Sequence, residues 1–329
     1  MFERSRMSVS SPVVPKMVRA VRPGSLGTVC RFAEHPFWNR AAPLAAEVTE
    51  HVTRAMHLVS HTQGGGTIPF TSLAGTAVDA FIGLQRPKVL SKRAWNSAPP
   101  VRPWLPNSPD VLKRAGLAWN ERDPHGPRGI DQVLLRVVVP RGYGELAEVV
   151  RQVLWLSPPG QAPELCEAAA LLVVARFDQL YRAGQPAAVG LERLKAALPV
   201  RRGFKRALVK LFPREMLEGV RQTCRTLLQL LPREQPFVYN PQWRRMGRLG
   251  ASDGDFIAGR TLYELKCFDP RSGRFSREHL FQLLGYACMN ACPPPGYHLE
   301  ALGFINPRAG FVWTMSLNAL CRAIGAGSF

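Results

Sequence analysis

The sequence predicts an α+β protein, in which a mainly helical N-terminal part precedes a C-terminal part with a small mixed sheet flanked by helices. Up to about residue 231, apolar residues recur at helical spacing. After Pro232 the pattern changes to short alternating segments, which are typical of strands. Hydrophobic residues make up 46% of the 329 positions, yet no apolar run approaches the roughly 20 residues of a bilayer-spanning helix. We therefore expect a globular protein without a transmembrane segment.

The N-terminal part is predicted to be mainly helical and basic. Residues 1–30 are basic and rich in Ser and Pro, which predicts a flexible arm. Apolar residues at helical spacing predict helices over residues 43–60, 73–84, 145–155, 163–183 and 187–198. Residues 86–128 are rich in Pro, Asn and charged residues, which predicts an irregular segment. We take residues 31–213 as one region that positions nucleic acid.

The C-terminal part, residues 214–329, is predicted to hold the sheet. It opens with an amphipathic helix over residues 214–230. Alternation and β-branched or aromatic residues then predict strands over 237–239, 297–305 and 310–315, a hairpin over 255–268, and a helix over 276–289. This order of elements gives a small sheet with helices packed against it.

The charge balance indicates a polyanionic partner. The formal net charge is +19, and residues 1–230 carry 32 basic against 17 acidic residues. Such an excess is more than solubility requires and favours nucleic acid, bound through its phosphates. A basic segment stands just before the C-terminal part, and its members are Arg201, Arg202, Lys205, Arg206 and Lys210. Affinity that depends on these residues should fall steeply with salt.

The predicted hairpin brings acidic residues together. Gly259 and Arg260 fit a two-residue type II′ turn, which requires Gly at its first central position. In that register Asp255 faces Glu264 and Asp253 faces Lys266. Because side chains alternate along a strand, all four polar groups would project from one face.

Two facing carboxylates repel each other unless a cation lies between them. Oxygen ligands select a hard ion such as Mg²⁺ or Mn²⁺, which can hold a phosphodiester and activate water. The ammonium of Lys266 would orient that water or stabilise developing charge. The hairpin therefore predicts phosphodiester hydrolysis.

These residues resemble the PD-(D/E)XK nuclease superfamily, which has the restriction-endonuclease-like fold. Its pattern is an Asp at one core strand and Glu-x-Lys on the next, which Asp255 and Glu264-Leu265-Lys266 match. The resemblance implies that Asp255 and Glu264 bind the metal, that Lys266 is catalytic and that the Leu265 carbonyl is a further ligand. It covers at most residues 214–317.

Further residues follow from the same resemblance. In several branches of the superfamily a Gln and a Tyr one turn apart lie on the next helix, which Gln282 and Tyr286 match. A helix before the first strand often supplies another Glu, for which Glu218 is preferred over Glu215. No Pro precedes Asp255, and Asp253 lies two residues before it, so either Asp is a candidate metal ligand.

Other sites are weaker alternatives. Asp253 and Lys266 are also explained by an ordinary cross-strand ion pair. His57 and His61 have the helical spacing of a zinc pair, but no catalytic Glu lies between them. Cys288 and Cys292 lack the cysteine triplet of iron-sulfur nucleases, and Gly64 to Gly66 lack the Lys-Ser/Thr of a phosphate loop.

The sequence thus favours a Mg²⁺- or Mn²⁺-dependent nuclease acting on DNA rather than RNA, in defence against foreign DNA or in DNA repair. The alternatives are an inactive nucleic-acid-binding module on the same fold and a structural subunit of a multi-subunit system, and the oligomeric state stays open. Seven scattered cysteines favour a reducing compartment, with the cytoplasm as the default.

Overall fold

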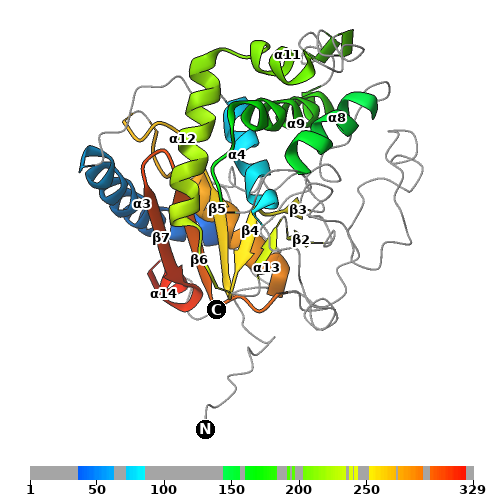
Figure 1. Cartoon of the computed structure of the whole chain (residues 1–329). Helices are drawn as coiled ribbons and strands as arrows, with labels where there is room; N and C mark the ends of the chain where they lie inside the picture. Colours follow the sequence, from blue (N-terminus) through cyan, green and yellow to red (C-terminus); the bar gives the residue numbers. More distant parts are fainter. Residues whose placement is uncertain are drawn as a thin grey trace.

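The structure is a computed structural model of the 329-residue chain (Figure 1). The residues that it describes are 36–62, 72–85, 144–155, 160–183, 191–192, 195–196, 203–234, 237–239, 241–243, 252–271, 273–291 and 297–323. Within them the fold is α+β, with a five-stranded mixed sheet in the C-terminal part. The predicted arm over residues 1–30 and the irregular segment over 86–128 lie outside the described residues.

The described N-terminal helices follow the apolar periodicity. They are α3 (Pro36–Thr62), α4 (Ser72–Leu84), α8 (Gly144–Trp155) and α9 (Leu165–Ala183). These confirm four of the predicted helices, and α3 begins earlier than its apolar stripe. Of the predicted helix over 187–198, residues 191–192 and 195–196 are described, and they are helical.

Two further helices lead into the sheet. α11 (Phe204–Lys210) buries Phe204 and Leu208, and it forms from the basic segment, for which no helix was predicted. α12 (Arg214–Leu230) has the predicted bounds and buries Leu217, Val220 and Leu227 on one side. Its other side is charged, as expected for an amphipathic helix lying on a core.

The sheet has the strand order β1-β4-β5-β6-β7. Its strands are β1 (Phe237–Tyr239), β4 (Phe256–Ala258), β5 (Thr261–Leu265), β6 (Ala301–Asn306) and β7 (Phe311–Ser316). β5 and β6 are parallel and the other neighbours are antiparallel. A parallel pair needs a crossover connection, and α13 (Arg277–Ala291) lies between β5 and β6 in the sequence. β7 leads directly into α14 (Leu317–Ala323).

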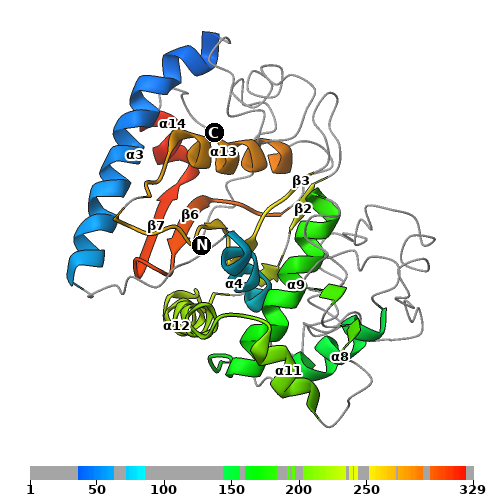
Figure 2. The same cartoon turned by 90° about the horizontal axis from the view of Figure 1, so that it is seen from above.

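Helices cover both faces of the sheet, as Figure 2 shows, with α3, α13 and α14 on one side and α4 and α12 on the other. On the α4 and α12 side the rings of Phe237, Phe256 and Tyr263 stack in a row across β1, β4 and β5, with successive centroids 5.0 Å apart. On the α13 side Ile257 and Leu262 are buried in a second core cluster. Because α4 and α9 share a core with the sheet, N-terminal residues can contribute to a site on it.

Gly303 on β6 is required by a close approach. It pairs with Tyr263 of β5, and a Cβ at position 303 would overlap the Tyr263 ring. We therefore expect Gly303→Ala to lower the free energy of unfolding by about 1–3 kcal/mol, since the buried ring has to shift. Urea denaturation of the two proteins measures this difference. Equal midpoints would show that the Tyr263 ring moves freely and that the row of stacked rings is not rigid.

Candidate functional site

The hairpin of β4 and β5 has the predicted register. Phe256 pairs with Tyr263 and Ala258 with Thr261, and Gly259 in the turn has a φ of 56°. Asp255 comes directly before this ladder, on the side of Glu264. Its Oδ2 accepts a hydrogen bond from the Leu265 amide at 2.6 Å, so its carboxylate lies against β5 beside Glu264.

Glu264 is a buried carboxylate with a neighbouring ammonium group. Only 2% of its side chain is exposed, and its Oε1 forms an ion pair with the Lys266 ammonium. Burial and the charge of Asp255 raise the pKa of Glu264, while Lys266 acts in the opposite direction. Burial alone would lower the pKa of Lys266, but Glu264 and Asp255 outweigh burial and raise it, so Lys266 stays charged.

A carboxylate of the N-terminal part also acts electrostatically on Glu264 and Lys266. Asp79 lies on α4, its Oδ1 is buried, and its charge raises the pKa of both Glu264 and Lys266. Sequence reasoning missed this residue because α4 is far from the hairpin in the chain. A signal was present, however, since Asp79 is the one charged residue of α4, SLAGTAVDAFIGL.

Cys267 directly follows Lys266, and several of the same charged groups act on its thiol. Its pKa is raised first by burial and then by Asp79 and Asp255, while Arg308 and Lys266 act in the opposite direction. A Cβ on Gly75 of α4 would lie 3.8 Å from the Cβ of Cys267, so α4 runs beside the end of β5. The raised pKa keeps the thiol protonated and makes it a poor nucleophile.

Asp253 is placed differently from the expectation that it faces Lys266. It lies in β3 (Ser252–Asp253), which forms a separate two-stranded sheet with β2 (Gln242–Trp243), and its partner there is Gln242. The chain leaves the hairpin at Gly254, whose amide donates to the Pro241 carbonyl. The amide of Lys266 donates instead to the Ile305 carbonyl, so the expected facing of Asp253 and Lys266 is wrong.

Gln282 and Tyr286 lie on α13, which covers the face of β5 that bears Leu262. Glu264 shares this face because side chains alternate along the strand. Gln282 donates through Nε2 to the Tyr286 hydroxyl at 2.6 Å, and the Tyr286 ring stacks on Trp243. The two residues therefore form one polar unit at the same face as Glu264.

His279 lies one turn before Gln282 on α13, and the charge of Lys266 acts on its ring. Its Nδ1 accepts a hydrogen bond from the Ser276 amide at 3.1 Å. Burial, and then the charge of Lys266, lower its pKa to about 4. The ring is therefore neutral at physiological pH, and it stacks with Phe268 and Phe275.

Glu218 has a different partner. On α12 it accepts a hydrogen bond from Arg221 at 2.9 Å, and Arg221 also donates to the Pro163 carbonyl. The charges that act on Glu264 belong to Asp255, Lys266 and Asp79. The helix acid whose charge acts on Glu264 is thus Asp79, whereas Glu218 pairs within α12 with Arg221, and Arg221 links α12 to the segment before α9.

The donor set fits a hard divalent ion that keeps much of its water. Mg²⁺ is commonly held by one or two carboxylates with water in the remaining positions, and Asp255 and Glu264 supply such a pair. Among the residues that the structure describes, no group of three or more His, Cys, Asp and Glu could hold a metal ion. A structural zinc site, which takes four protein ligands, is therefore not formed within those residues.

The other predicted residues that the structure describes have surroundings of their own. Lys205, Arg206 and Lys210 are exposed on α11, whereas Arg201 and Arg202 lie outside the described residues. The His57 ring contacts the Gly273 carbonyl at 3.4 Å. Cys288, on α13, is buried in the hydrophobic core of the protein. Cys292 is outside the described residues.

Comparisons of the chain with protein-family models, with curated proteins and with solved structures give no match. Among the described helices none is long and apolar enough to cross a membrane. The functional argument therefore depends on the chemistry of the residues themselves.

Proposed function

We propose that the protein is a Mg²⁺- or Mn²⁺-dependent nuclease that hydrolyses phosphodiester bonds, with DNA as the favoured substrate. The observation that supports this most is the buried Glu264 beside Asp255, with Lys266 paired to it. Burying carboxylates next to each other costs free energy, and a bound divalent cation recovers that cost. The resemblance to PD-(D/E)XK nucleases rests on the same three residues.

The residues divide the reaction between them. Asp255 and Glu264 would hold the ion, which supplies a bound water of lowered pKa and a positive charge for the phosphate oxygens. In the hydrolysis the attacking water would give up one proton as its oxygen bonds to phosphorus, the bond to the leaving oxygen would break, and that oxygen would take up one proton. Lys266 acts as a cation and hydrogen-bond donor rather than as a base, because its neighbours raise its pKa.

Other residues of the site would orient these groups. Asp79 adds negative charge and strengthens the attraction for a cation. Gln282 and Tyr286 form a hydrogen-bonded unit on the sheet face of Glu264 and would position Lys266 or the attacking water. We further propose that the reaction serves defence against foreign DNA or DNA repair in the cytoplasm.

A second candidate is a nucleic-acid-binding module that does not cut. It is favoured by the net charge of +19 and by the exposed Lys205, Arg206 and Lys210 on α11. The third candidate is a structural subunit that binds RNA or an acidic protein through its basic surface. Such a subunit would copurify with that binding partner.

Cleavage of linear, circular and single-stranded DNA by the full chain, with and without Mn²⁺, tests the proposal. We expect products only with Mn²⁺ or Mg²⁺, and RNA serves as the comparison substrate. Salt-sensitive binding without any cleavage would replace the nuclease by the binding module. Cleavage that persists in EDTA would contradict a metal-dependent mechanism.

A further inference from the structure

A second polar group lies next to the nuclease-like site. Asp269 and Arg271 follow β5, and Arg308 follows β6. Because β5 and β6 are parallel, their carboxyl ends meet at one edge of the sheet, where ligands of such sheets commonly bind. These three residues take no part in the reaction described above.

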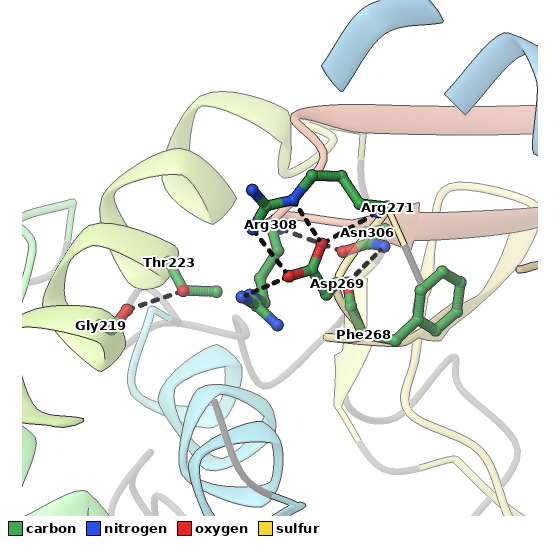
Figure 3. Close-up of polar contacts among 7 residues, drawn as sticks. All are labelled: Gly219, Thr223, Phe268, Asp269, Arg271, Asn306 and Arg308. Carbon is green, nitrogen blue, oxygen red and sulfur yellow. Dashed lines mark hydrogen bonds and ion pairs between the residues drawn. The ribbon is translucent and has the colours of Figure 1, made fainter. Parts of the chain in front are cut away.

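Asp269 holds two guanidinium groups. Its Oδ1 accepts from the Arg271 amide at 2.9 Å and from Arg271 Nε at 3.2 Å, and its Oδ2 accepts from Arg271 Nη2 at 3.1 Å. Nη2 of Arg308 lies 3.7 Å from the same Oδ2. Figure 3 shows the Asp269 carboxylate between the two arginines.

The surrounding backbone fixes this arrangement. Asn306, which is fully buried, accepts from the Arg308 amide at 3.1 Å and donates to the Phe268 carbonyl at 3.1 Å. It thereby joins the segment after β5 to the turn after β6, as Figure 3 also shows. Arg308 is the inner cation, with 11% of its side chain exposed, and Arg271 is the outer one, with 48% exposed.

Both guanidiniums approach the single carboxylate of Asp269. Asp269 uses only part of the N–H donors of Arg271, and the planar fork suits a phosphate. Asp269 lies three residues after Lys266, and the Phe268 carbonyl between them is bound by Asn306 at the end of β6, so this group adjoins the end of β5 that carries Lys266.

We propose that Arg271, oriented by Asp269 and backed by Arg308, binds a backbone phosphate of the nucleic-acid strand next to the phosphodiester that is cleaved. This inference rests on the proposed function. Asp269 fixes the guanidinium before the strand arrives, so less side-chain entropy is lost on binding. The contact would place the strand relative to Asp255 and Glu264.

Arg271→Gln is the test, because this exposed side chain can be removed without opening the core. Its matched control is Arg260→Gln, since Arg260 is also exposed, pairs with Glu300, and lies in the turn at the opposite end of β5. Binding of a short fluorescein-labelled DNA duplex is followed by anisotropy in EDTA, so that cleavage does not interfere. We expect Arg271→Gln to weaken binding roughly tenfold and to reduce the salt slope by about one.

Arg260→Gln should bind like the unaltered protein, and thermal melting checks that both variants are folded. Unchanged affinity of Arg271→Gln would overturn the inference, and so would equal losses in both variants, since these would reflect net charge alone. The proposed function fails separately, when the unaltered protein does not cleave DNA with Mn²⁺. In that case the comparison of Arg271→Gln with Arg260→Gln still reports on the phosphate contact.

Discussion

Glu264→Gln is expected to abolish Mn²⁺-dependent cleavage while the protein keeps its fold and its affinity for DNA. Glutamine has the shape of the buried carboxyl group but lacks the charge that attracts the ion. We expect cleavage to fall by about a thousandfold, equivalent to about 4 kcal/mol of transition-state stabilisation. Single-turnover cleavage measures the rate, and anisotropy in EDTA measures the affinity.

The same variant should change how stability depends on pH. The folded protein raises the pKa of Glu264, so it holds this proton more tightly than the unfolded chain does. The metal-free protein therefore loses stability as the pH rises from the usual pKa of a glutamate side chain through the raised pKa of Glu264. Glu264→Gln removes this loss, and its melting temperature should match or exceed that of the unaltered protein in alkaline buffer.

Glu300→Gln is the matched control for both measurements. Glu300 is exposed and pairs with Arg260 at the opposite end of β5, so its loss should leave cleavage and the pH profile unchanged. Full cleavage by Glu264→Gln would remove Glu264 from the active site. A large loss of DNA affinity in that variant would instead indicate a structural role.

The hairpin could be predicted because its determinants are local. Gly259 at positive φ fixes the turn, and the turn fixes the pairing of Phe256 with Tyr263. The prediction was wrong at Asp253, because a strand register extends only as far as both strands remain paired. Here Gly254 turns away toward Pro241 and takes Asp253 into another small sheet.

Contacts between distant parts of the chain could not be predicted in the same way. The charge of Asp79 acts on Glu264 only because α4 packs against the sheet, on the face that carries the stacked rings. The pairing of Asp269 with Arg308 likewise depends on the parallel arrangement of β5 and β6. Neither arrangement has a local sequence pattern, whereas the amphipathic α12 does, and its bounds were predicted correctly.

Asp79→Asn is expected to lower Mn²⁺-dependent cleavage by about tenfold or less, because Asp79 acts on Glu264 through its charge alone. The change removes a negative charge that acts on Glu264 and Lys266 but keeps the size of the side chain. Because Asp79 raises the pKa of Glu264, its loss lowers that pKa. Metal binding requires the ionised carboxylate, so the pH at half-maximal Mn²⁺ binding should shift downward.

The pH shift separates an electrostatic role of Asp79 from a structural one, since simple destabilisation of α4 would not lower the pKa of Glu264. A double variant with Glu264→Gln adds a second criterion. If both residues act through one metal site, the double variant should cleave no more slowly than Glu264→Gln alone, because their effects are then not additive. Independent, multiplying losses together with an unshifted pH profile would place Asp79 outside the site and assign its buried carboxylate to the packing of α4.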